Sequence, residues 1–319
     1  MNTADSGHMK AFEDFVSQVD SEGLMVEGLC VLQDGKTAFE HRWTPDQDRN
    51  IYSHAKSFVS TAVGIAIDDG LLTLDDRLVD TFPDKVPAGG NPDLEKIRLR
   101  HLLTMSSGFG KALLMLDDRR KGVGFPDYLA YMLSQPVVDE PGARFCYSTA
   151  DSILLGRMLE RKTGKHLLEY LYGRILRPMG IPCPIWECCP QGHPIGGGGM
   201  FLHLKDMIRL GQLYLDEGKW EGKRIVSAEW VRTATAFQIE TRNPVTKEDL
   251  SAHPGNPWNM GYGYQFWLSP YPSAYRADGA FGQITTVLPE KGFVVGIQCP
   301  ENGDFGPVQA VLHEMIERL

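Results

Sequence analysis

Two apolar stretches near the start of the chain are separated by the pair Asp34-Gly35. Asp-Gly readily adopts the positive φ angles of a tight hairpin turn, so residues 24–43 are predicted to form a β-hairpin. The next apolar stretch, Phe58 to Ala66, leaves hardly any polar face, which is typical of a buried helix. Asp69-Gly70 is expected to end that helix.

Helical spacing of apolar residues dominates the middle of the chain. It is clearest at 151–176, with an interruption at Gly164, and again at 203–218. After Trp258 the pattern is typical of strands, at 261–268, 279–289 and 291–299. The final stretch, 307–319, spaces its apolar positions along one helix face.

Strands at both ends of the chain and helices between them predict an α/β (α+β) fold with one antiparallel sheet. We expect residues 9–75 and 235–319 to build the sheet and its flanking terminal helices. Residues 76–234 are expected to form an inserted, mostly helical domain, and residues 1–8 a tag or a disordered end. The 319 residues suffice for one large or two modest domains. A site is expected in the cleft between sheet and helices.

Composition narrows the class of protein. A formal charge of −9 argues against nucleic-acid binding, which needs a basic surface, and it suits a small neutral or cationic ligand. The longest apolar run, Phe58 to Ile67, is interrupted by polar residues and falls short of the ~18 residues of a membrane span. The expected partner is therefore a small molecule, with no nucleic acid and no membrane. The oligomeric state is left open.

The cysteines and the N-terminus bear on the compartment. Six scattered cysteines in a long chain suggest reduced thiols in the cytoplasm, and the N-terminus lacks the features of a secretory signal. The letters SGHM at 6–9 resemble a cloning remnant, in which case a trimmed signal would indicate the periplasm instead. Three cysteines and a histidine between 183 and 193 match no common zinc spacing, so we expect loop thiols and no metal site. They are Cys183, Cys188, Cys189 and His193.

The first candidate for chemistry is the S-x-x-K pair Ser53 and Lys56, at the start of the predicted buried helix. Residues three apart share a helix face, so the amine would lie beside the hydroxyl. Burial and the helix N-terminus both disfavour a cation, and a lysine with a lowered pKa can take a proton from serine. The alternative is a helix-capping serine next to a solvated lysine, which one S-x-x-K does not exclude.

The second candidate is Tyr147, in the sequence FCYSTAD. A phenol near a lysine cation has a lowered pKa and can act as a base, although a tyrosine ahead of Ser-Thr is also typical of a core ring before a helix cap. The chain has no G-x-S-x-G, H-E-x-x-H, Walker or G-x-G-x-x-G motif. The four glycines at 196–199 are expected to form a flexible or closely packed loop.

The order of these motifs resembles the serine β-lactamase and penicillin-binding-protein superfamily, in its class C-like branch. After the S-x-x-K helix come DDGLLTLDDRLVDTFP, LRHLLTMSSGFG and FCYSTADSILLGRMLERKTG. LRPMGI, the stretch 196–231, GYGYQFWL and GAFGQITTVLPEKGFVVGI are similar to the esterase, amidase and nylon-oligomer (6-aminohexanoate-dimer) hydrolase members. The resemblance runs from about residue 24 to the C-terminus.

The resemblance implies a helical domain on an α/β domain and an acyl-enzyme mechanism without metal or organic cofactor. Ser53 would attack a carbonyl, and Lys56 and Tyr147 would handle the proton, either one as the formal base. The implied oxyanion hole consists of the backbone N–H groups of Ser53 and Ala280, and such donors usually make the largest single catalytic contribution.

Two positions depart from the family pattern. Thr149 stands where the family often has asparagine, and a hydroxyl makes fewer hydrogen bonds to an acyl amide. Ala277-Asp278-Gly279 stands in place of Lys-Thr-Gly or His-x-Gly, so the cation that anchors a substrate carboxylate is absent. Thr149, Asp278 and Gly279 are the expected substrate-binding positions. Asp278 is expected either beside a cationic substrate end or facing solvent.

These departures favour a serine hydrolase of small neutral esters or amides, or of substrates with a cationic end near Asp278. The enzymatic alternatives are a β-lactamase, a D-aminopeptidase or a D-Ala carboxypeptidase, and the other alternative is a catalytically weak binding or sensor protein. Residues 107–125 are expected either as a lid over the site or as an ordinary surface loop. One or two of five aromatic residues are expected to contact substrate. These five are Trp186, Trp258, Tyr262, Tyr264 and Trp267.

Overall fold

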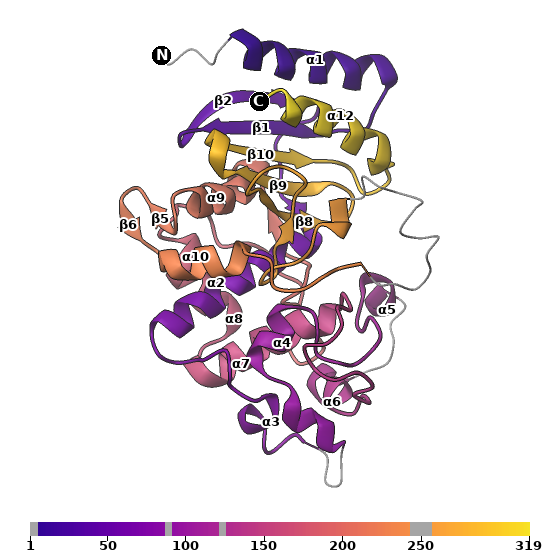
Figure 1. Ribbon diagram of the computed structural model, residues 1–319, viewed down its shortest axis with the longest axis vertical. Helices are drawn as coiled ribbons and strands as arrows, with labels where there is room; N and C mark the ends of the chain where they lie inside the picture. Colours follow the sequence, from indigo (N-terminus) through magenta and orange to yellow (C-terminus); the bar gives the residue numbers. More distant parts are fainter. Residues whose placement is uncertain (1–5, 87–90, 121–125, 243–256) are drawn as a thin grey trace.

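The central feature of the computed structural model, which describes residues 6–86, 91–120, 126–242 and 257–319, is a six-stranded antiparallel sheet (Figure 1). The strand order is β2-β1-β10-β9-β8-β7. The strands are β1 (Gly28–Gln33), β2 (Lys36–Arg42), β7 (Trp267–Leu268), β8 (Tyr275–Gly279), β9 (Gln283–Leu288) and β10 (Phe293–Gln298). The two ends of the chain meet where β1 pairs with β10, with Cys30 opposite Gly296. The predicted α/β class and antiparallel sheet are confirmed.

The hairpin predicted over residues 24–43 is formed by β1 and β2. Asp34 and Gly35 have φ angles of 49° and 75°, the left-handed conformation that an Asp-Gly turn accommodates. Every residue of β9 and of β10 is buried. Burial along the whole strand, in place of alternation, indicates that both faces of the sheet are covered.

Helices cover both faces of the sheet (Figure 1). On one face α1 (Ser6–Glu22) and α12 (Phe305–Glu317) contact each other over an apolar layer that contains Val295. On the other face α9 (Leu204–Leu215) contacts β1, β9 and β10, and Val294 belongs to that layer. Successive strand residues point to opposite faces, so Val294 and Val295 serve different layers. Gly211 lets α9 approach closely, because a Cβ there would lie 2.5 Å from Cγ1 of Val294.

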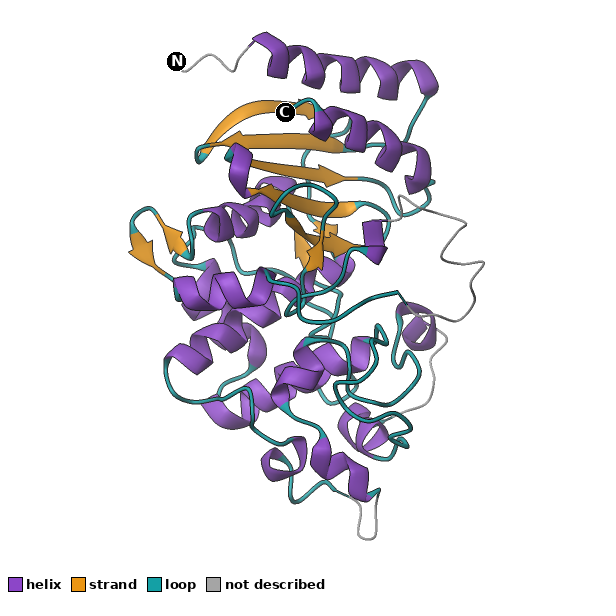
Figure 2. Cartoon of the chain, in the orientation of Figure 1, coloured by secondary structure: helices purple, strands orange, loops and turns teal. Residues whose placement is uncertain are grey.

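The predicted buried helix is α2 (Ala55–Asp68), and every residue from Ala55 to Ala66 is buried. Together with α7 (Thr149–Thr163), which it contacts, α2 forms the centre of a helical body beside the sheet (Figure 2). The other helices are α3 (Leu78–Thr81), α4 (Leu99–Leu103), α5 (Leu116–Arg120), α6 (Tyr128–Leu133), α8 (Leu167–Leu171), the π-helical turn η3 (Tyr172–Leu176) and α10 (Ala228–Thr235). Gly64 of α2 allows the ring of Trp230 on α10 to pack against the helix backbone.

Short strands and 3₁₀ turns lie in several of the connections between these elements. The two-residue strand pairs are β3 (Arg49–Asn50) with β4 (Phe201–Leu202) and β5 (Lys219–Trp220) with β6 (Lys223–Arg224). The 3₁₀ turns are η1 (Tyr52–His54), η2 (Pro92–Lys96), η4 (Pro257–Asn259) and η5 (Pro289–Lys291). The turn η1 leads directly from β3 into α2 and carries Ser53.

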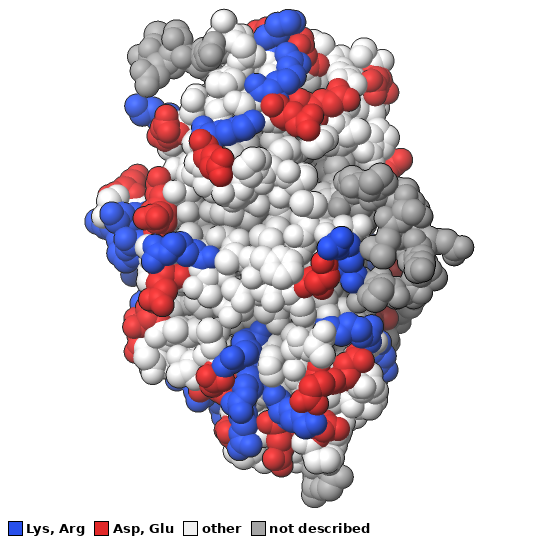
Figure 3. Space-filling view, in the orientation of Figure 1, with Lys and Arg blue, Asp and Glu red and all other residues white. Residues whose placement is uncertain are grey.

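The remaining sequence expectations concern the chain ends and the surface. Residues 6–8 form the first turn of α1, and residues 1–5 lie outside the described residues. The domain boundaries at 76 and 235 stay a prediction, and α9, which lies between them, packs on the sheet. In the described ranges, no helix is long and apolar enough to cross a membrane. All six cysteines are free. Acidic and basic side chains are interspersed on the face seen in Figure 3.

Candidate active site

Ser53 lies where the sheet meets the helical body, in η1 and two residues before α2 begins. Tyr52 precedes it with a φ of 47°, and the Tyr52 N–H donates to Oδ1 of Asn50 at 2.9 Å. A non-glycine residue in this conformation costs on the order of 1–3 kcal/mol and persists only where its surroundings impose it. Here the Tyr52 hydroxyl donates to Glu301 at 2.6 Å, and η1 contacts β8 and β9. These contacts hold Ser53 in place.

Lys56 lies beside Ser53, as the three-residue spacing predicts. Its Nζ is 3.1 Å from Oγ of Ser53 and donates to the Gly197 carbonyl at 2.6 Å. The residue is 1% exposed. Burial lowers the pKa of Lys56 well below its usual value, the charge of Arg119 lowers it further, and the charge of Asp151 opposes the shift. A buried lysine held in this way is available as a neutral base.

Tyr147 faces the same two residues. Its ring centroid is 5.0 Å from Nζ of Lys56, and the ring stacks on Trp267 at 5.5 Å. Burial raises the pKa of Tyr147, a hydrogen bond to Ser53 lowers it in part, and the charge of Asp278 raises it. The direction is opposite to the lowering expected from a nearby lysine cation. The physical reason is that burial disfavours both the phenolate and the lysine charge that was to stabilise it.

The neighbouring histidine is not placed to serve as the base. His54 Nε2 lies 2.9 Å from Oγ1 of Thr285, on β9. Burial lowers the pKa of His54 to about 3. This side chain therefore anchors η1 to the sheet.

The four glycines at 196–199 form a closely packed loop against the site. A Cβ at Gly197 would lie 2.8 Å from Cγ2 of Thr149 and 2.9 Å from Nζ of Lys56. Trp186 holds this loop in place, because its Nε1 donates to the carbonyls of Ile195 and Gly198, both at 2.9 Å. The loop thus supplies a backbone carbonyl that orients the lysine, a role that the sequence pattern did not reveal.

The stretch Ala277-Asp278-Gly279 reaches the site through its backbone. Gly279 ends β8 against Ile51, whose carbonyl oxygen would overlap with any Cβ at that position. Ala280 follows and is exposed. Asp278 is turned away from solvent: its side chain is 9% exposed, and Oδ2 is 2.9 Å from Arg276 Nε and 3.1 Å from Trp258 Nε1. The expectation that Asp278 faces solvent is therefore wrong, because β8 buries the side chain and Arg276 neutralises it.

Thr149 is the first residue of α7, and its Oγ1 is 3.5 Å from Sδ of Met115. Met115 belongs to residues 107–125, which were expected to form either a lid over the site or an ordinary surface loop. Within it, Leu113 accepts a hydrogen bond from the Ala150 N–H at 3.1 Å and donates its own N–H to Ser148 Oγ at 3.1 Å. Residues 107–120 therefore pack on the start of α7, and residues 121–125 lie outside the described residues.

The five aromatic residues divide by location. Tyr262, Trp267 and Trp258 belong to a small apolar cluster that includes Tyr147. Tyr264 packs on Trp230 in the main core, to which Trp186 also belongs. The cluster around Tyr147 therefore lies beside Lys56 and the candidate site.

Two charged residues near the site, Asp151 and Arg119, were not predicted from the sequence. Asp151, on α7, is fully buried, and its Oδ1 accepts from Ser107 Oγ at 2.8 Å. Burial raises the pKa of Asp151 to about 8. Arg119, on α5, donates to the Leu114 carbonyl at 2.7 Å, and its Nη2 would lie 3.6 Å from a Cβ at Gly198. Asp151 is the last residue of FCYSTAD and Arg119 stands in no motif. That both charges lie near Lys56 follows only from the packing of α5 and α7.

Replacing Gly279 by alanine is expected to lower kcat/KM at least ~10-fold, because the backbone that leads to Ser53 must move. The Cβ would overlap with the Ile51 carbonyl and lie 3.0 Å from Cβ of Gln283. Overpacking of this kind also costs about 1–3 kcal/mol of stability. Ester hydrolysis and thermal unfolding check both effects. Gly173→Ala is the matched control, because nothing lies within 4 Å of its Cβ. Equal behaviour of the two variants would contradict the expectation.

Comparison with known proteins adds an independent finding. The Beta-lactamase family profile matches residues 11–309. The curated 6-aminohexanoate-dimer hydrolase of Paenarthrobacter ureafaciens is 24% identical over 282 residues, which cover 78% of this chain and 71% of that protein.

Solved structures share the fold. A penicillin-binding protein homologue from Caulobacter crescentus superposes with a TM-score of 0.75 at 15% identity, over 100% of this chain and 99% of the other. EstCE1, described as a hydrolase with promiscuous acyltransferase activity, superposes with a TM-score of 0.73 at 16% identity, over 98% of both chains. At these identities the likeness shows the fold alone.

Proposed function

The chain belongs to the beta-lactamase family and is a serine hydrolase, and on that premise we propose that it cleaves small esters or amides through an acyl-enzyme on Ser53. One observation carries the proposal. The Lys56 amine is 1% exposed, lies 3.1 Å from Oγ of Ser53, and has a lowered pKa. A neutral amine at hydrogen-bond distance from a hydroxyl is the arrangement that activates a nucleophile.

In the proposed acylation step, Ser53 gives its proton to Lys56 while Oγ forms a bond to the substrate carbonyl carbon. The carbonyl electron pair moves to oxygen and is stabilised by the N–H groups of Ser53 and Ala280. Collapse of the intermediate breaks the bond to the leaving group, which takes a proton from Tyr147 or, through it, from Lys56. Water then attacks the acyl-enzyme with the same residues as base and acid, and the acid product leaves.

Lys56 is the better candidate for the formal base. Burial lowers the pKa of Lys56 and raises the pKa of Tyr147. At neutral pH the amine can therefore accept a proton while the phenol keeps its own. Tyr147 is accordingly assigned to proton delivery and to orienting Ser53.

The charges around the site bear on the substrate class. Arg276 is engaged by Asp278, so it is not free to anchor a substrate carboxylate as a β-lactam or a D-Ala terminus would require. The same ion pair occupies the Asp278 carboxylate, so that carboxylate is not free to bind the cationic amino group of a D-aminopeptidase substrate. This weakens the D-aminopeptidase alternative. Thr149 and Gly279 line the site without charge. We therefore assign neutral esters and amides as the preferred substrates, with Arg119 available to a substrate oxygen near Gly198.

Active-site labelling tests the proposal. A fluorophosphonate should add once per chain, and digestion should place the adduct on Ser53. Ser57 and Ser60, on the helix α2 that follows Ser53, are internal controls, because their hydroxyls are buried and donate to the carbonyls of Gln265 and Tyr264, both at 2.7 Å. p-Nitrophenyl butyrate should be turned over steadily. A folded protein that is neither labelled nor active would favour the binding or sensor alternative. Faster turnover of penicillin or D-alanyl dipeptides would favour the enzymatic alternatives.

A further inference from the structure

A cluster apart from the proposed active site brings together Glu160, His166 and His193. Glu160 lies near the end of α7, His166 immediately before α8, and His193 in the loop ahead of the four glycines. Each offers one potential ligand atom, and these atoms lie within 4.8 Å of one another. We propose that this cluster binds a divalent transition-metal ion such as zinc, with the three side chains as ligands and water in a fourth position.

Two buried polar atoms of the cluster lack a hydrogen bond. Glu160 Oε2 lies 2.8 Å from His193 Nδ1 and 3.3 Å from Arg157 Nε, yet neither contact has the geometry of a hydrogen bond, and His193 Nδ1 makes no other hydrogen bond within the described part of the chain. The Glu160 side chain is 10% exposed. An unsatisfied buried polar group costs about 1–3 kcal/mol. A cation bound between the two atoms would satisfy both.

The other atoms of the cluster are oriented as metal ligands usually are. His166 Nε2 lies 2.9 Å from the Gly192 carbonyl, and donation to that oxygen leaves Nδ1 unprotonated. The Leu167 N–H donates to Oε1 of Glu160 at 3.0 Å. Contacts of this kind fix the tautomer and direction of metal-binding side chains.

The cluster is accessible and can adjust to an ion. His166 is exposed, and a hollow of about 200 Å³ opens on Glu160 and His193. Zinc bonds of about 2.0–2.2 Å place neighbouring ligand atoms of a tetrahedral site roughly 3.3–3.5 Å apart, so the distance between Glu160 and His193 must widen by roughly half an ångström. His193 lies in a loop, where such a shift leaves the helices undisturbed.

The positive charge of Arg157 should weaken zinc binding, and its removal gives a direct test of the proposal. Its Nε lies 3.3 Å from Oε2 of Glu160. A positive charge so near the ligand atoms weakens the binding of a second cation. Arg157→Gln should therefore tighten zinc binding, whereas a cluster that merely packs would show no gain.

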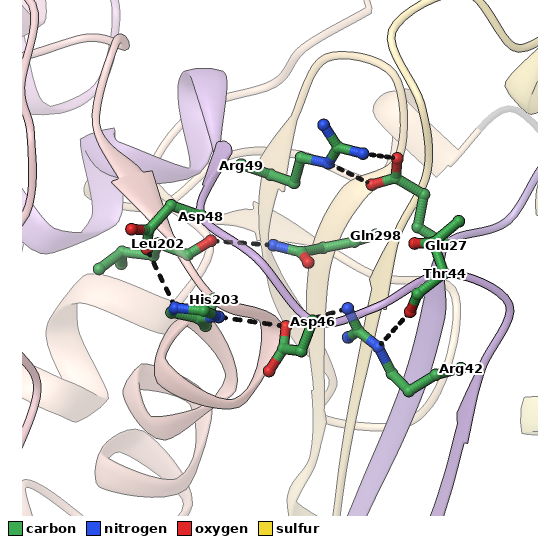
Figure 4. Close-up of polar contacts among 9 residues, drawn as sticks. All are labelled: Glu27, Arg42, Thr44, Asp46, Asp48, Arg49, Leu202, His203 and Gln298. Atoms are coloured by element: carbon green, nitrogen blue, oxygen red, sulfur yellow. Dashed lines mark hydrogen bonds and ion pairs between the residues drawn. The ribbon is translucent and has the colours of Figure 1, made fainter.

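His203 supplies a matched control (Figure 4). It also lies between carboxylates, with Nδ1 3.4 Å from Asp46 and Nε2 3.5 Å from Asp48. The two ring nitrogens lie on different edges of the imidazole and face different aspartates, so they cannot ligate one ion together. His203 is therefore a suitable control: it lies near acidic residues, but its ligand atoms do not converge on one point.

The experiment is a zinc titration by equilibrium dialysis with metal analysis, together with thermal unfolding at each concentration. The protein carries no polyhistidine tag, and Cys183 and Cys188 are replaced by serine throughout, because both thiols are exposed and would bind zinc themselves. The expected result is one saturable zinc ion per chain, with unfolding at higher temperature, because a ligand that binds the folded state stabilises it.

The variants distinguish the outcomes. Glu160→Gln and His193→Ala should weaken zinc binding at least 10-fold, Arg157→Gln should strengthen it, and His203→Gln should leave it unchanged. Absence of saturable binding by the folded parent protein would overturn the proposal. So would equal binding by the His193→Ala and His203→Gln variants.

Discussion

Replacement of Ser53 by alanine should lower kcat/KM for p-nitrophenyl butyrate at least ~10³-fold, since loss of a nucleophile leaves only binding and oxyanion stabilisation. The fold should survive, because Ser53 is only partly buried and its backbone contacts do not depend on the hydroxyl. Initial-rate kinetics and thermal unfolding of the purified variant check both points.

Ser57→Ala is the matched control for this variant. Ser57 lies four residues further along, and its hydroxyl donates to the Gln265 carbonyl at 2.7 Å. Loss of that buried hydrogen bond should cost about 0.5–1.5 kcal/mol of stability and leave turnover within a few fold. Near-full activity of Ser53→Ala, with normal folding, would show that the nucleophile is another residue.

Lys56→Met should lower kcat/KM about 10²–10⁴-fold, the usual contribution of a positioned base. It should also raise the unfolding temperature at neutral pH. The pKa of Lys56 is lower in the folded protein, so the unfolded chain binds the extra proton and folding becomes more favourable as pH rises. Methionine does not titrate, so it removes the free-energy cost of keeping a neutral lysine in the folded protein. A variant that loses both activity and stability would contradict this account.

The pH dependence of the wild-type enzyme tests the same assignment. Because only the neutral amine accepts a proton, kcat/KM should rise with pH. The midpoint of this rising limb should lie well below the usual lysine pKa. Arg119→Gln should shift the limb to higher pH, since the guanidinium charge helps to keep Lys56 neutral. Arg120→Gln is the control: Arg120 is exposed and paired with Glu301. If the limb has the same midpoint pH in both variants, the charge of Arg119 does not lower the pKa of Lys56.

Tertiary packing decides the role of Asp278 in the stretch Ala277-Asp278-Gly279. From the sequence, Asp278 was a candidate for binding a cationic substrate end or for facing solvent. In the structure Arg276, two residues earlier on the same strand, points to the same side and closes an ion pair with it. That pair is the physical reason why the site presents no free charge from β8.

The local structure of this protein, meaning its turns, its helices and the contacts between near neighbours in the chain, was predictable from the sequence. The hairpin at Asp34-Gly35, the buried helix after Ser53, and the adjacency of Ser53 and Lys56 all follow from backbone geometry over a few residues. The family resemblance extended this to the fold, which the antiparallel sheet and the family match confirm.

Tertiary structure decided the rest. The Gly197 carbonyl on Lys56, the charge of Arg119, and the opposite pKa shifts of Lys56 and Tyr147 arise where distant segments pack together. The cluster of Glu160 and His193 has the same origin. The physical reason is that periodicity depends only on near neighbours along the chain. Burial and charge interactions depend instead on which surfaces meet, and no spacing within one segment encodes that.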